Sequence, residues 1–211
     1  MSPATAAPSE LFASGPAHPP FRWQCHSYIL LRSKAFAATV PLPFIERICL
    51  MLLEGSCHCR KIRFRLESKH PYPFNLCYCS ICRKTAGGGG YAINLGGEAE
   101  SLKVKGKKNL AVYQAKLPNE QGKLKKSPAR RHFCQQCGSP LWVWDPRWPE
   151  LIHPFACAID TPLPIPPERV HLMLDSKAPW VVPTTAKRDQ KYAEYPREAI
   201  AEWHQRLGLE K

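Results

Sequence analysis

The sequence is short of acidic residues. Its 211 residues include 17 Asp and Glu against 30 Lys and Arg, which leaves a formal net charge of +13. Much of this excess lies in Lys103–Arg131, a stretch with ten Lys and Arg but one acid, Glu120. The positive charge is therefore local, and an acidic partner or substrate would be attracted to one region of the protein.

The sequence also lacks an uninterrupted apolar run long enough to span a membrane. The apolar stretch Ala35–Leu53 contains Glu46 and Arg47, so it cannot cross a bilayer as a helix. Within it, Ala35–Ile45 resembles the core of a signal peptide, but it lies far from residue 1 and contains two prolines. We expect no interaction with membranes.

The first 50 residues contain few acids and show neither a helical nor a strand period. They are rich in Ala, Pro and Ser, and their only acids are Glu10 and Glu46. We interpret residues 1–50 as a low-complexity, disordered extension and expect the folded domain to begin at Met51. An organellar targeting sequence is the alternative, although no clear amphipathic helix accompanies its arginines.

From Met51 onward, short runs of aromatic and β-branched residues alternate with Gly, Pro and Asn. This texture is typical of an antiparallel, mainly β domain, which we expect over residues 51–195. Short helices are predicted at Ser80–Thr85 and Pro166–Val170, and a C-terminal helix within residues 196–211, at Arg197–Leu207. The predicted strands are Ile62–Leu66, Phe74–Tyr78, Tyr91–Leu95, Ser101–Lys105, Leu110–Ala115, Arg131–Cys134, Leu141–Trp144, Ile152–Ile159 and Val170–Leu174.

The cysteines are grouped rather than scattered. Of the ten, seven lie in one Cys-x-Cys, one Cys-x-Cys-x-x-Cys and one Cys-x-x-Cys cluster. These spacings suit metal ions better than a framework of disulfides. Reduced thiols indicate a cytoplasmic setting, with a nuclear or organellar one as the alternative.

The first and third clusters together supply four thiols. Cys57 and Cys59 are separated by one residue, so on an extended backbone both would point to the same face. Cys134 and Cys137 bracket a tight turn that Gly138 can close without a Cβ penalty. Four thiolates complete a tetrahedral structural zinc site, and the alternative is that each pair is a buried or redox-active pair of thiols.

The second cluster supplies only three thiols: Cys77, Cys79 and Cys82. Three protein ligands leave one tetrahedral position for water or substrate, which is the pattern of a catalytic zinc site. Zinc there would hold a substrate thiol as its nucleophilic thiolate. The alternative is that a fourth protein ligand closes the site, and the candidates are Cys157, His132 and His153.

Cations follow the second cluster directly, at Arg83 and Lys84. Thiolates on zinc leave a net negative charge, which these cations can balance. They can equally anchor the carboxylates of an anionic substrate, because a guanidinium binds a carboxylate in a bidentate fork. Similar pairs, Arg60-Lys61 and Arg130-Arg131, lie beside the other two clusters.

These motifs, in this order and spacing, resemble those of the glutathione-dependent formaldehyde-activating enzyme family, which includes centromere protein V. The similarity covers about residues 51–195. The segments that carry it are Gly55–Cys59, Cys77–Lys84, Phe133–Ser139 and Asp175–Trp180.

The resemblance implies a zinc-bearing β-tent fold with one structural and one catalytic zinc ion. It also implies a carbon–sulfur lyase similar to S-(hydroxymethyl)glutathione synthase, which reversibly adds the glutathione thiol to formaldehyde. The alternative function is a zinc-stabilised binding module for nucleic acid or another acidic partner, based on Lys103–Arg131. Tyr113 is the only aromatic residue in that stretch available for base stacking.

Overall fold

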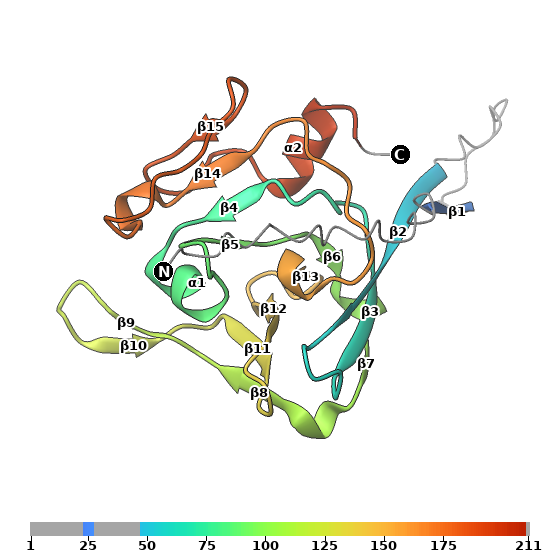
Figure 1. Ribbon diagram of the computed structural model, residues 1–211, viewed down its shortest axis with the longest axis horizontal. Coiled ribbons are helices and arrows are strands. Elements are labelled where there is room, and N and C mark those ends of the chain that lie inside the picture. The colour runs from blue at the N-terminus through green and yellow to red at the C-terminus, as the bar shows by residue number, and fades with distance from the viewer. Residues whose placement is uncertain (1–22, 28–46, 210–211) are drawn as a thin grey trace, which may run out of the picture.

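The computed structural model describes residues 23–27 and 47–209. These residues form a mainly β protein with short helices, and Figure 1 shows three larger sheets arranged around the core. Of the expected extension at residues 1–50, the structure describes only residues 23–27 and 47–50. These form a strand and the start of a second one, so the predicted boundary at Met51 falls within a strand.

The first sheet has the order β1-β2-β3-β7 and is antiparallel throughout. Strand β3 illustrates why this sheet forms. Every second residue of the strand, Phe64, Leu66 and Ser68, is buried, while the residues between them face outward. The strands are β1 Trp23–Ser27, β2 Arg47–Ser56, β3 Arg63–Ser68 and β7 Lys103–Lys105.

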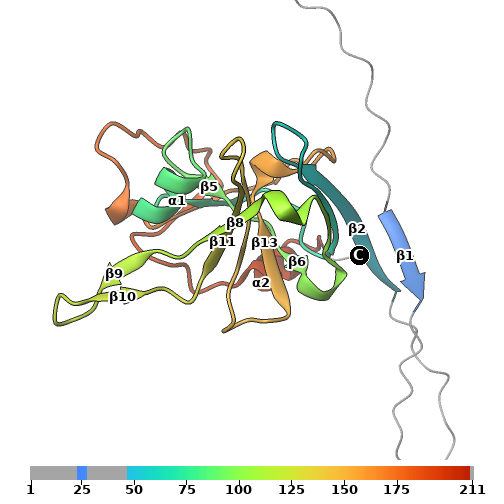
Figure 2. The same cartoon turned by 90° about the horizontal axis from the view of Figure 1, so that it is seen from below.

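The second sheet has the order β6-β13-β12-β11-β8 and is also antiparallel. Its strands are β6 Gly97–Glu98, β8 Leu110–Tyr113, β11 Arg130–Cys134, β12 Pro140–Trp144 and β13 Leu151–Pro154. Between β8 and β11 the hairpin of β9 Lys116–Pro118 and β10 Leu124–Lys126 projects from the body of the molecule (Figure 2).

The third sheet has the order β15-β14-β4-β5 and is mixed. Its strands are β4 Asn75–Cys77, β5 Ala92–Ile93, β14 Val170–Leu172 and β15 Gln190–Lys191. Strand β14 pairs in parallel with both β4 and β15. The mainly antiparallel architecture is confirmed, with this sheet as a local departure.

Two α-helices flank the sheets: α1 Ser80–Thr85 and α2 Ile200–Arg206. Helix α1 has the predicted bounds. Helix α2 begins later than predicted, at a point where the Glu202 carboxylate accepts the backbone N–H of Ala199 at 2.8 Å. Four 3-10 turns lie at Ala99–Ser101, Lys107–Asn109, Ala156–Ala158 and Leu174–Ser176.

Two local predictions are wrong. Residues 166–169 do not form a helix, because this segment leads directly into β14, whose Val170 pairs with Asn75. The predicted strand Ile152–Ile159 stops at Pro154, where the Phe155 N–H turns to the Leu141 carbonyl at 3.0 Å and a 3-10 turn follows.

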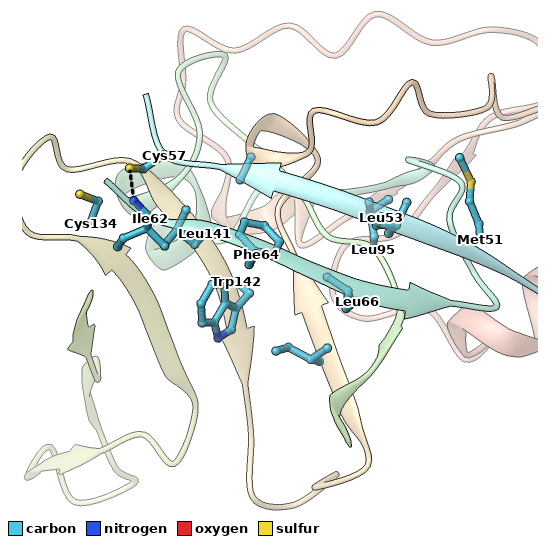
Figure 3. Packing of buried hydrophobic residues seen from close by; sticks show 12 residues of the cluster. Met51, Leu53, Cys57, Ile62, Phe64, Leu66, Leu95, Cys134, Leu141 and Trp142 are labelled. Carbon is cyan, nitrogen blue, oxygen red and sulfur yellow. Dashed lines mark hydrogen bonds between the residues drawn. The ribbon is translucent and has the colours of Figure 1, made fainter. Parts of the chain in front are cut away.

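A hydrophobic core between the first two sheets reaches the first and third cysteine motifs. Phe64 and Trp142 pack edge to face, with ring centroids 5.1 Å apart. Cys57 and Cys134 belong to this core and close one end of it, as Figure 3 shows. A second core lies between the second and third sheets and contains Cys77 and Cys82. The cores therefore place each group of thiols at a junction of two sheets.

Among residues 23–27 and 47–209, no helix is both long and apolar enough to cross a bilayer.

Candidate metal centres

The first and third cysteine motifs meet in space. The sulfur atoms of Cys57, Cys59, Cys134 and Cys137 all lie within 4.8 Å of one another. Two of the separations are 3.5 Å, between Cys57 and Cys59, and 3.8 Å, between Cys59 and Cys134. Sulfurs about 2.3 Å from a tetrahedral ion would be about 3.8 Å apart, so this group fits a metal ion such as zinc.

The Cys57–Cys59 motif is a turn, not the extended segment expected from its spacing. The Arg60 N–H donates to the Cys57 carbonyl at 2.8 Å, and Arg60 adopts a left-handed φ of 57°. The Ile62 N–H then donates to the Cys57 sulfur at 3.3 Å (Figure 3). The chain thus folds back on itself, which brings both thiols to one side.

The Cys134–Cys137 motif is the expected tight turn. The Gly138 N–H donates to the Cys134 carbonyl at 2.8 Å, and Gly138 has a φ of 73°, which a glycine adopts without strain. The Ser139 hydroxyl lies 3.2 Å from the Cys137 sulfur, and this hydrogen bond lowers the pKa of the Cys137 thiol to about 5. A thiolate, the form that binds metal, is therefore favoured here.

The three thiols of the second motif also converge. Cys77 ends β4, Cys79 precedes α1 and Cys82 lies within α1, and their sulfurs all lie within 4.8 Å of one another. The Cys79 sulfur caps the helix by accepting the Cys82 N–H at 3.3 Å. Hydrogen bonds from the Cys77 and Cys82 thiols lower the pKa of Cys79 to about 2.

No fourth Cys, His, Asp or Glu donor joins these three thiols in the part of the chain that the structure describes. The three candidates lie elsewhere. The His132 ring stacks on Trp142, with centroids 5.1 Å apart, and Nδ1 of His153 lies 3.1 Å from the Leu95 carbonyl. Cys157 lies on the exposed 3-10 turn after β13.

The fold brings Arg131, from a different sheet, towards the three-thiol group. It lies opposite Val143 in the sheet, and Val143 packs in the same core as Cys77 and Cys82. Its positive charge acts on the Cys82 thiol. Its Nε and Nη1 atoms are buried and have no hydrogen-bond partner among residues 23–27 and 47–209. Buried N–H donors without an acceptor destabilise a fold unless a ligand accepts their hydrogen bonds.

The two predicted anion anchors differ in their surroundings. Arg83 is half-buried in α1, and its Nε atom is also buried without a partner among the described residues. Lys84, the next residue, is exposed to solvent. Arg83 is therefore the better placed of the two to receive an anion near the thiols.

Tyr195 lies within electrostatic range of the thiols, and the sequence analysis missed it. Its side chain is 71 % exposed. The surrounding chain nevertheless desolvates the phenol enough to raise its pKa, and the negative charge of Cys77, Cys79 and Cys82 raises it further. No sequence pattern marks this residue, because it lies far along the chain from the motif. Arg131 could have been assigned to this site from strand alternation, which puts it on the opposite face of β11 from Cys134.

A buried series of polar contacts runs from Tyr78, within the second cysteine motif, through His171 to Asp189. The Tyr78 hydroxyl lies 2.9 Å from Nδ1 of His171, and Nε2 of His171 lies 3.5 Å from an Asp189 carboxylate oxygen. Desolvation lowers the pKa of His171, which favours the neutral ring. Because Tyr78 separates Cys77 from Cys79, this series of contacts fixes the backbone that carries both thiols.

A family model and a curated relative point to the same family. The family model described as glutathione-dependent formaldehyde-activating enzyme matches residues 52–175. A curated protein of Halomonas elongata, provisionally named a glutathione-dependent formaldehyde-activating enzyme, is 62 % identical over 161 residues, which cover 76 % of this chain and 99 % of that protein. A crystal structure of a Rhodobacter sphaeroides protein, 25 % identical, matches with a TM-score of 0.41 over 53 % of this chain and 91 % of that one.

Proposed function

The chain belongs to the glutathione-dependent formaldehyde-activating enzyme family, and from this we propose that it is a zinc-dependent carbon–sulfur lyase. The reaction would be the reversible addition of a glutathione-type thiol to formaldehyde or a similar aldehyde. The observation that carries the proposal is a group of three converging thiols that no fourth protein donor joins among the described residues.

The residues present fit zinc. Both groups consist entirely of thiols, a donor set that suits zinc better than it suits magnesium or calcium. We assign a structural ion to Cys57, Cys59, Cys134 and Cys137, where it would tie the β2–β3 turn to the β11–β12 turn. We assign a catalytic ion to Cys77, Cys79 and Cys82. Zinc bound there supplies a Lewis acid that holds a substrate thiol as its thiolate.

The surrounding side chains would bind and orient the substrate. Arg131 and Arg83 carry buried guanidinium atoms without partners in the described part of the chain, and glutathione offers two carboxylates for them. Two anchored carboxylates would hold the thiol in a single orientation, which lowers the entropic cost of reaction. Lys84, which is exposed, would attract the anionic substrate over a longer distance.

Tyr195 would act on the aldehyde oxygen. In the forward reaction the sulfur–carbon bond forms, the carbonyl π electrons move to oxygen, and the proton lost by the thiol ends on that oxygen. A tyrosine hydroxyl keeps its proton at neutral pH, so Tyr195 can donate a hydrogen bond to the developing oxyanion. Thiolate-bound zinc needs a reducing compartment, so we propose a cytoplasmic setting.

The test is zinc content together with the enzyme-catalysed rate of S-hydroxymethylglutathione formation. We expect Cys79→Ala to lower zinc from two ions to one per chain and to abolish catalysis. Cys157→Ala is the matched control and should keep both, because Cys157 belongs to neither group of thiols. Unchanged turnover in Cys79→Ala would refute the assignment.

A second candidate function is nucleic-acid binding by the β9–β10 hairpin. All six strand residues of the hairpin are exposed, and it projects from the body as a two-stranded ribbon (Figure 2). Lys116, Lys125 and Lys126 lie on it. A major groove admits such a ribbon, and phosphate contacts would weaken steeply with salt. A titration that detects no affinity for duplex or single strands at low salt would exclude this function.

A further inference from the structure

An apolar hollow of about 350 Å³ lies between the end of α1 and the face of β8 and β11. Tyr113, Arg131 and Phe133 line its sheet side. Arg131 and Tyr113 are cross-strand partners, and Phe133 is two residues from Arg131, so all three side chains share one face of the sheet. Thr85 and Phe155 also line it, as do Gly138 and Pro140 next to the third cysteine motif.

Two lining residues connect the hollow to the three-thiol group. Thr85 ends α1, three residues after Cys82, and Phe155 packs in the same core as Cys77 and Cys82. Arg131 lines the hollow and lies opposite Val143, which packs in the same core as Cys77 and Cys82. The hollow therefore lies on the side of the thiols formed by the end of α1 and the shared core, where a substituent on a bound sulfur can extend.

The hollow is larger than formaldehyde, the smallest aldehyde, would need. Its lining is also mainly apolar. Aromatic rings and aliphatic carbon form most of its lining, and Arg131 adds one cation. A cavity of about 150 Å³ already holds a benzene molecule. The polar backbone of a peptide thiol would leave its amide groups without partners against such a lining, whereas an apolar group would not.

We infer that this hollow binds an aromatic or branched apolar substituent on the aldehyde carbon, so that the natural adducts derive from aldehydes larger than formaldehyde. This inference rests on the proposed function and names its substrate class. The bond change is the same one: the thiol sulfur bonds to the carbonyl carbon of the larger aldehyde, and the thiol proton ends on the carbonyl oxygen. No oxidant or reductant is required.

Binding of two thioethers to the zinc-loaded, full-length protein tests the inference without turnover. S-benzylglutathione carries an aromatic group where S-methylglutathione carries a single carbon. Because burying an aromatic ring is favourable, we expect the benzyl compound to bind at least about tenfold more tightly by calorimetry.

Tyr113→Ala should reduce that preference to below about threefold. Tyr113 lies on an edge strand and is 47 % exposed, so its removal leaves the fold intact. Val112→Ala is the matched control, because Val112 is the preceding residue, faces the other side of the sheet and is 51 % exposed. Phe133→Ala is a second variant expected to behave like Tyr113→Ala.

Equal affinities for the two thioethers, beside normal turnover of formaldehyde, would overturn this inference and leave the proposed function standing. A benzyl preference that Tyr113→Ala and Phe133→Ala leave unchanged would overturn the assignment to this hollow. Absence of turnover together with absence of binding by either thioether would overturn both.

Discussion

Arg131→Met removes the guanidinium beside the three thiols and should weaken binding of the anionic thiol. Nε and Nη1 of Arg131 are buried without a partner in the described residues, and either N–H group can donate a charge-assisted hydrogen bond to a carboxylate. One hydrogen bond to a charged group contributes about 1.5–3 kcal/mol. A loss of about 2–3 kcal/mol would raise KM for glutathione by about 30- to 150-fold.

Steady-state kinetics with glutathione as the varied substrate measures this effect. Arg130→Met is the matched control: Arg130 is the preceding residue, is exposed, and lies over the Trp144 ring at 5.0 Å on the opposite face of the strand. We expect its KM to stay within about twofold of the wild type, since surface substitutions have small effects. Equal KM values for the two variants would refute the anchoring role, and loss of zinc from Arg131→Met alone would indicate that Arg131 only balances the thiolate charge.

Three further predictions concern stability. Trp203→Ala should lower the free energy of unfolding by about 3–5 kcal/mol in urea, because the ring is 1 % exposed and stacks on Phe74 with centroids 3.7 Å apart; a loss below about 1 kcal/mol would contradict this packing role. Cys134→Ser should lower the melting temperature far more than Cys79→Ala does, since we assign a structural ion to Cys134; similar melting temperatures would argue against that division. Burial lowers the pKa of His204 to about 4, against 6.5 in the unfolded chain. Between these two values only the unfolded chain takes up this proton, so the free energy of unfolding should fall by up to about 3 kcal/mol as the pH drops to 4. His204→Gln should flatten the stability profile between these pH values, and an identical slope in variant and wild type would disprove the contribution.

The parts of the fold set by local patterns could be predicted from the sequence. Ser80–Thr85 forms a helix with the predicted bounds, since the residue before it supplies a capping atom. The pairing of Cys57 and Cys59 with Cys134 and Cys137 was also predictable, because ligand number and spacing restrict the combinations.

The parts that depend on distant partners could not be predicted. The parallel pairing of β14 with β4 joins residues about 95 positions apart, and no short-range signal separates it from antiparallel pairing. Pro166–Val170 has residues compatible with a helix start, but the pairing of Val170 with Asn75 decides its conformation. The position of Tyr195 beside the thiols depends in the same way on how the C-terminal segment packs.

The central claim is that Cys77, Cys79 and Cys82 hold a zinc ion with one position left for a thiol. A crystal structure of the zinc-loaded protein, solved with zinc anomalous scattering before and after soaking with glutathione, tests it most directly. We predict one ion with four protein sulfurs and a second ion with three, whose fourth ligand becomes the glutathione sulfur after soaking. A fourth protein ligand on the second ion, or no metal at these three thiols, would contradict the proposal.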